Sequence, residues 1–128
     1  MKTGAMMKVW GGIAGVQSTL AVLLERGHFD RGLPLERIAA LTAATPARRF
    51  RIARKGELAP GNDADLMLVD LSGSHTLSTG DLHQRHALSP YVGSTFRGVV
   101  RRTLLRGEII FKDGAITAQS GGALVRPS

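Results

Sequence analysis

The sequence contains no cysteine, few aromatic residues and no long apolar run. Without cysteine, the chain has no disulfide bond, thiolate metal site or cysteine nucleophile. Aromatic residues make up 5%, with one tryptophan and one tyrosine, which leaves little material for stacking the bases of a single-stranded nucleic acid. No stretch approaches the roughly 18 apolar residues of a membrane span, and the N-terminal pattern is not that of a signal peptide. We therefore expect a cytoplasmic protein that does not bind membranes.

The length limits the possible architectures. A chain of 128 residues has the size of one ordinary domain and can bury a core, but a (β/α)8 barrel takes roughly 250 residues. Hydrophobic residues make up 43% of the sequence and charged residues 21%, a composition typical of globular proteins. The sequence therefore predicts a globular chain that is too short for a complete barrel.

The charge balance is strongly basic. Lysine and arginine number 17 against 10 acidic residues, giving a net charge of +7. A basic chain is compatible with nucleic-acid binding, but cations also favour the C-terminal end of a helix. Because aromatic residues are scarce and no nucleic-acid motif is present, we favour a solvated helix end or a surface that faces another protein segment. The basic residues form one cluster in the sequence, which consists of Arg48, Arg49, Arg51, Arg54 and Lys55.

The N-terminal part of the chain has a pattern of loop and helix. Gly11, Gly12 and Gly15 indicate a flexible or tightly turning stretch. The apolar residues that follow have helical spacing, and Gly27 stands where it would end a helix. These apolar residues are Val16, Leu20, Leu23 and Leu24.

Two further helices are predicted. One begins at Pro34, a residue favoured in the first turn, and continues to Thr42. Thr45 and Pro46 then interrupt the pattern, and they are typical of the N-cap and first residue of a short helix over Ala47–Phe50. These helices are apolar enough to require a partner surface.

From Lys55 onward the pattern is that of short β-strands. We predict a buried strand over 64–69, a helical turn within 77–86 capped by Ser78 or Thr79, and strands over 99–105, 108–111 and 115–118. The turns at Arg106-Gly107 and Asp113-Gly114 separate the last three strands, and Asp-Gly is the type I′ hairpin signal, with positive φ at both residues. Together these strands form a small antiparallel meander, which needs a covering layer.

Three groups of residues are candidates for metal binding or catalysis. On a helix His83 and His86 would share a face, but they lack a third metal ligand at a recognisable spacing, so we favour surface histidines. Asp63 and Asp65 flank a strand entry, where carboxylates commonly accept backbone hydrogen bonds and have a structural role. The segment 72–75, Ser-Gly-Ser-His, offers a hydroxyl and a base but lacks a nucleophile elbow and an acidic partner, so a loop is predicted.

The glycine-rich stretch 11–15 has neither the Gly-Lys-Ser/Thr ending of a P-loop nor a Gly-x-Gly-x-x-Gly frame. The residues considered by themselves therefore identify no catalytic residue and no metal site.

Four segments resemble allantoinases, members of the cyclic amidohydrolase superfamily that includes dihydropyrimidinases, hydantoinases and dihydroorotases. The most specific are Trp-Gly-Gly-Ile at 10–13, within a resembling segment that spans 7–17, and Arg-His at 85–86 followed by Ser-Pro-Tyr-Val-Gly at 89–93. The stretch 58–66 is similar to the superfamily's entry into its β-sandwich, and 103–107 with 112–114 is similar to its C-terminal hairpins. Hydantoinases and dihydropyrimidinases usually have Pro-Asn-Gly at positions 10–12, which favours allantoinase.

The resemblance implies a substrate and a cofactor. Family members hold two divalent metal ions, usually zinc, and a metal-bridging hydroxide attacks the cyclic amide while an aspartate shuttles the proton. The resemblance places the metal ligands and this aspartate before position 1 of this sequence, so the chain is expected to be inactive alone and to need no cofactor of its own. It assigns Gly11, Gly12 and Ile13 to substrate binding, with the main chain presented to the ring of a cyclic ureide. Alternatively, these glycines only shape a turn.

The fold class expected from the resemblance is α+β. Residues 1–54 correspond to the C-terminal tail of a barrel with its substrate loop, and residues 55–128 to part of a β-sandwich. Two departures stand out. Thr45 stands where relatives in the family usually have Asn. Arg51 stands where they commonly have Gly at the end of a helix, and a left-handed conformation there would disfavour arginine by about 1 kcal/mol.

Three hypotheses about function remain at this point. The first is the C-terminal part of an allantoinase-like hydrolase of purine catabolism. The second is a non-enzymatic remnant or partner domain that forms homo-oligomers or complements a separate N-terminal half. The third, ranked last, is a nucleic-acid-binding module. Unpaired strand edges are expected to favour association between chains.

Overall fold

Two helical segments precede an antiparallel sheet in the computed structural model, which describes residues 12–117 and 121–127. The first segment consists of α1 (Thr19–Val22) and the π-helical η2 (Leu23–Phe29), and the second of α2 (Leu35–Ala39), the π-helical η3 (Ala40–Ala44) and α3 (Thr45–Arg49). The helices and the sheet confirm the α+β prediction for this chain. No helix in these described ranges has the length and apolarity that a bilayer span requires.

The prediction that the first helix ends at Gly27 is wrong, because the helical segment continues to Phe29. Gly27 instead makes room for the returning chain, because a Cβ there would lie 3.3 Å from Cδ2 of Leu33. The chain turns at Gly32, which has a φ of +67° and donates its N–H to the carbonyl of His28 at 2.9 Å. The glycine at the end of the helix is therefore Gly32.

The predicted interruption at Thr45 and Pro46 is also wrong, because α2, η3 and α3 follow one another without a gap. Thr45 has helical dihedral angles and is no N-cap. Pro46 has no N–H to donate to the preceding turn. The π-helical segment η3, which has wider turns than an α-helix, ends at Ala44, and the helix accommodates the missing hydrogen bond there. Arg51, just after α3, has a φ of 51°, so the left-handed position expected there is occupied by arginine.

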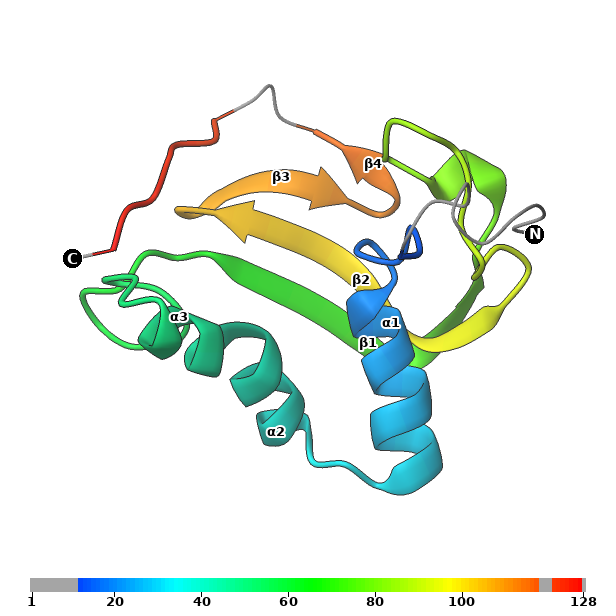
Figure 1. Cartoon of the computed structure of the whole chain (residues 1–128), viewed down its shortest axis with the longest axis horizontal. Coiled ribbons are helices and arrows are strands. Elements are labelled where there is room, and N and C mark those ends of the chain that lie inside the picture. Colours follow the sequence, from blue (N-terminus) through cyan, green and yellow to red (C-terminus); the bar gives the residue numbers. More distant parts are fainter. Residues whose placement is uncertain (1–11, 118–120, 128) are drawn as a thin grey trace.

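The sheet has the strand order β1-β2-β3-β4, all neighbours antiparallel (Figure 1). The strands are β1 (Leu66–Thr76), β2 (Thr95–Leu105), β3 (Glu108–Lys112) and β4 (Ala115–Ile116). The predicted meander is confirmed, and both residues of each predicted turn, Arg106-Gly107 and Asp113-Gly114, have positive φ. The predicted end of the last strand at Ala118 lies outside the described residues.

The first strand differs from its prediction in length and burial. It extends to Thr76 and passes through the segment 72–75 that was predicted as a loop. The pairing with β2 shifts between Asp70 and Ser74, and Asp70 Oδ1 accepts hydrogen bonds from Ser72 N at 3.0 Å and Gly73 N at 3.2 Å. The carboxylate of Asp70 thus satisfies the backbone of the bulge, and the strand continues beyond it. Met67 and Leu68 are about half exposed, so β1 is not a buried strand.

The core lies where η2 meets β2. Leu24, at 3% exposure, and Phe96, at 7%, come from these two elements, and Ile38 of α2 is also buried at 3%. Gly98 of β2 has a φ of +84°, and a Cβ there would lie 2.8 Å from Cδ1 of Leu24. The absence of a side chain at Gly98 therefore allows the helix to approach the strand closely.

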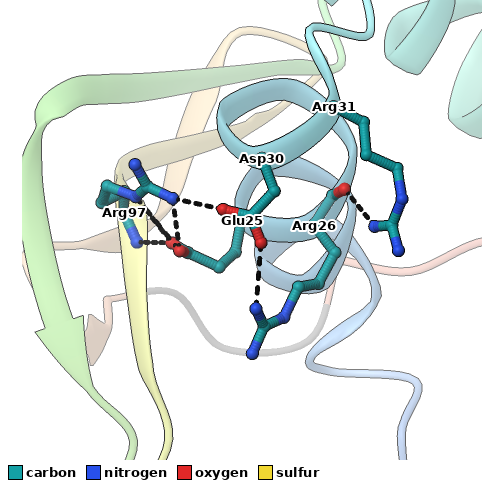
Figure 2. Close-up of polar contacts among 5 residues, drawn as sticks. All are labelled: Glu25, Arg26, Asp30, Arg31 and Arg97. Carbon is teal, nitrogen blue, oxygen red and sulfur yellow. Dashed lines mark hydrogen bonds and ion pairs between the residues drawn. The ribbon is translucent and has the colours of Figure 1, made fainter.

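Arg97 flanks this contact with a set of charged hydrogen bonds between sheet and helix (Figure 2). Its Nη2 donates to Glu25 Oε1 at 2.6 Å and to Asp30 Oδ1 at 2.7 Å, and its backbone N donates to Glu25 Oε2 at 2.7 Å. The guanidinium also lies 4.7 Å from the ring centroid of Phe29. Hydrogen bonds from the Arg97 side chain, and then from its backbone, lower the pKa of Glu25 from 4.5 to about 2.

We expect Gly98→Ala to lower the free energy of unfolding by about 2–4 kcal/mol, because positive φ and overpacking against Leu24 both oppose the added methyl group. Urea unfolding followed by circular dichroism measures the change. The matched control is Gly107→Ala, where φ is +89° but a Cβ would meet no atom within 4 Å, so the loss is expected to be near 1 kcal/mol. Equal losses in the two variants would contradict the packing argument.

Acid should weaken the contact between η2 and β2. The pKa of Glu25 is lower in the folded chain than in the unfolded chain, so its stabilisation is complete above pH 4.5 and is lost as the pH falls toward 2. Glu25→Gln should therefore be less stable than wild type at pH 7 and match it near pH 2, as measured by urea unfolding at each pH. A pH-independent difference for Glu25→Gln would speak against this account.

Candidate functional site

The loop 12–18 precedes α1 and contains two of the three predicted substrate-binding residues. Gly12 has a φ of +75°, and Ile13 is 64% exposed. The carbonyl of Gly15 accepts the backbone N–H of Ser18 at 3.1 Å and the hydroxyl of Thr19 at 3.3 Å, so the base of the loop is joined to the helix. The third predicted residue, Gly11, lies outside the described residues.

A second segment, 75–83, leaves the end of β1 and contains the 3-10 turn η4 (Thr79–Asp81). Ser78 and Asp81 form a capping box, in which Asp81 Oδ2 accepts the N–H and the hydroxyl of Ser78, each at 2.7 Å. Hydrogen bonds from Ser78 are the main cause that lowers the pKa of Asp81. The prediction that Ser78 or Thr79 caps a turn is therefore confirmed for Ser78.

His75 corrects one sequence interpretation. Its Nε2 lies 3.1 Å from Asp81 Oδ2, so the acidic partner that the sequence analysis did not find is present. The hydroxyl of Ser78 donates to the same carboxylate oxygen. A hydrolytic triad needs a serine that donates to the histidine, so these three residues form a cap and not a nucleophile with its base.

The side chain of Gln17 connects the loop 12–18 to this second segment. Its Nε2 donates to the carbonyl of Asp81 at 2.6 Å, and its Oε1 accepts the N–H of His83 at 2.9 Å. The loop also approaches Tyr91, whose Cε2 would lie 3.3 Å from a Cβ at Gly15. The loop 12–18 and the stretch 85–93 that resembles allantoinases are thus close to one another at Gly15 and Tyr91.

A cavity of about 650 Å³ opens between α1, the sheet and the segment 75–83. Its polar lining residues include Gln17, His75, Asp81 and His83, and its apolar ones Leu20, Leu24, Met67, Leu77, Phe96 and Phe111. A cavity of this size that is mostly apolar with a few polar groups can take a small molecule or an apolar segment of protein. The loop contributes Val16 and Gln17 to the lining.

The residues present do not fit the metal centre that family members generally use. Within the described parts of the chain, no group of three or more His, Cys, Asp or Glu side chains is placed to hold a metal ion. His83 and His86 lie outside the helices, so they do not share the helical face considered above. The His83 ring packs edge-on against Phe111, with the centroids 6.2 Å apart.

Asp63 and Asp65 have the structural role predicted for them. Lys55 Nζ forms ion pairs with both carboxylates, at 2.9 Å to Asp63 Oδ2, and Asp65 Oδ1 accepts the N–H of Arg106 at 2.8 Å. The hydrogen bond from Lys55 is the main cause that lowers the pKa of Asp65. Arg54 also pairs with Asp63 at 3.0 Å. Two cations of the basic cluster therefore neutralise carboxylates of this chain.

Comparison with known proteins places these features in a family. The sequence pattern described as the amidohydrolase family matches residues 4–110. The chain belongs to the amidohydrolase family. It is 61% identical over 128 residues to an allantoinase from Solibacter usitatus and 54% identical to one from Rubrobacter xylanophilus, with 99% of this chain and 28% of each relative covered. The chain therefore spans just over a quarter of the length of these relatives, and its resemblance to allantoinases is confirmed.

Solved structures support the same family. The fold is similar to that of an L-hydantoinase (dihydropyrimidinase) from Arthrobacter aurescens, with a TM-score of 0.83 and 29% identity over 90% of this chain and 26% of that one. A D-hydantoinase from a Thermus species has a TM-score of 0.89 and 25% identity over 96% of this chain and 27% of its own. The arrangement of the helices and sheet of this chain is thus shared with proteins of quite different sequence.

Sequence reasoning did not identify Gln17 as part of this site. Its two hydrogen-bond partners lie 64 and 66 residues away, and a single glutamine before a helix carries no signal of such a distant contact. Position within a stretch that resembles allantoinases was the one feature that could have singled it out.

Proposed function

We propose that this chain forms the C-terminal part of an allantoinase-like cyclic amidohydrolase, which hydrolyses the cyclic amide bond of allantoin. The observation that carries the proposal is the 61% identity to an allantoinase along the length of the chain. In this proposal residues 1–54 end the barrel and residues 55–128 form part of the β-sandwich. The other part of the relatives' length holds the metal ions and the proton-shuttling aspartate.

The contribution of this chain is substrate recognition. Gly12 and Ile13 lie in an exposed loop, and a residue without a side chain lets a planar ring rich in amide groups come close to the main chain. Allantoin presents N–H donors and carbonyl acceptors that match such main-chain groups. Gly11 is assigned the same role by resemblance. Hydrolysis needs an activated water, and the resemblance assigns the ligands of the metal ions that supply it to a part of the enzyme outside this chain, so we expect the chain alone to be inactive.

The test is a chimera in which this chain replaces the matching segment of the Solibacter usitatus allantoinase. With zinc bound, the chimera should hydrolyse allantoin, whereas the isolated chain should not, as measured by loss of allantoin. Gly12→Val in the chimera should lower kcat/KM by at least about tenfold, because a side chain displaces the ring from the main chain. The matched control is Gly61→Val, since both glycines have positive φ and neither Cβ would meet an atom within 4 Å. A zinc-loaded, folded chimera without activity would refute the proposal, as would ring opening by the chain alone.

We also propose that another polypeptide covers the sheet, either the rest of the enzyme or a second copy of this chain. The outer strand β1 pairs with β2 on one side, and its successive residues Met67 and Leu68, which point to opposite faces of the sheet, are 52% and 51% exposed. Among the described residues no strand pairs with the outer edge of β1, and an apolar outer strand with such an edge is a template for association. No role for nucleic acid or membranes is included in this proposal.

In isolation the chain should therefore self-associate. Sedimentation velocity should give a mass above the 13.6 kDa of one chain, increasing with concentration. Leu68→Lys should shift the distribution toward the monomer, because a charge on the outer strand opposes pairing of strands. Leu88→Lys is the control, since Leu88 is 71% exposed but lies outside the strands. A wild-type chain that stays monomeric at every concentration would count against association through β1.

A further inference from the structure

We infer that Gln17 is a positioning residue, which fixes the substrate loop 12–15 against the segment 81–83 and so sets where Gly12 and Ile13 meet the substrate. This inference rests on the proposed function for the role of the loop. The contact itself is independent of that function, because it consists of two hydrogen bonds between described residues, to the Asp81 carbonyl at 2.6 Å and from the His83 N–H at 2.9 Å.

The geometry uses both ends of the side-chain amide. Nε2 donates to one main-chain group and Oε1 accepts from another, two residues further along. Such a pair of bonds fixes the direction of the side chain as well as its distance from the segment. Glutamate, methionine or leucine at this position would lose at least one of the two bonds.

Each end of this connection is itself held in place. On the loop side, Ser18 follows Gln17 directly, is 5% exposed and accepts the N–H of Val22 at 2.9 Å. On the other side, the capping box with Ser78 and the contact with His75 hold Asp81. Gln17 therefore joins the start of a helix to a capped turn, and the segment between Gly12 and Gln17 is short.

The tip of the loop is exposed, with Ile13 64% exposed to solvent. The base of the loop is joined to the sheet half of the chain by the bonds of Gln17 and by the close approach of Gly15 to Tyr91. Gln17 lies only a few residues from the tip, so a change in its bonds is expected to move Gly12 and Ile13.

The first experiment measures hydrogen exchange in the full chain. Gln17→Met keeps the length of the side chain and removes both hydrogen bonds, so the amide of His83 and the loop peptide 12–18 should exchange about fivefold faster, the factor expected from one lost hydrogen bond. The matched control is Gln84→Met. Gln84 also donates to two carbonyls, of His86 at 3.1 Å and Leu88 at 2.6 Å, but within its own segment, so this variant should leave the loop unchanged. Unchanged loop exchange in Gln17→Met, or equal changes in both variants, would overturn the inference.

The second experiment uses the chimera with the Solibacter usitatus allantoinase described above. Gln17→Met should raise KM for allantoin about fivefold while kcat and zinc content stay near wild type, because a displaced loop weakens binding of the ring without altering the reacting groups. Gln84→Met should change neither constant. An unchanged KM in an active Gln17→Met chimera would overturn the role in substrate positioning. If the wild-type chimera is inactive but loop exchange still responds to Gln17→Met alone, the proposed function fails while the positioning of the loop by Gln17 is supported.

Discussion

The contact between Leu24 of η2 and Gly98 of β2 is the constraint on which the rest of the structure depends. Because Gly98 has no side chain, the helix can pack directly on the strand, and Leu24 is nearly fully buried there. Arg97 then binds Glu25 and Asp30 beside this contact. The position of the helix determines where its first residues lie, and so it brings the loop 12–18 beside the turn at Asp81.

Charge has a structural role throughout the chain, which changes the interpretation of its basic character. Glu25 and Asp70 bind Arg97 and Arg101 across elements, and Asp65 binds Lys55. These carboxylates have lowered pKa values because cations donate hydrogen bonds to them. Part of the excess positive charge lies on the neighbouring Arg102 and Lys112, which face one another across β2 and β3. Like charges in this arrangement repel.

Family membership and activity rest on different parts of the molecule. The helices, the sheet and the two stretches that resemble allantoinases place the chain in the amidohydrolase family. Catalysis in that family depends on a metal centre, for which the described residues provide no ligand set. What these residues do provide is an exposed loop, held near an apolar cavity with a polar end.

The sequence alone determined the elements that follow from local chemistry. The hairpins, the two turns with positive φ and the Ser78 cap were predictable, because each depends on residues close together in the chain. The structural role of Asp63 and Asp65 was predicted as well, although part of it depends on Arg106, which lies 41 residues from Asp65 in the sequence. The motifs at 10–13 and 85–93 identified the family for the same reason. Tertiary structure decided the features that depend on distant contacts. The helix continued past Gly27, where the returning chain lies close at Leu33, and the strand continued past residue 72, where Asp70 binds the backbone of the bulge. His75 gained a carboxylate partner, and Gln17 gained partners more than 60 residues away, because folding brings together groups whose separation in sequence carries no local signal.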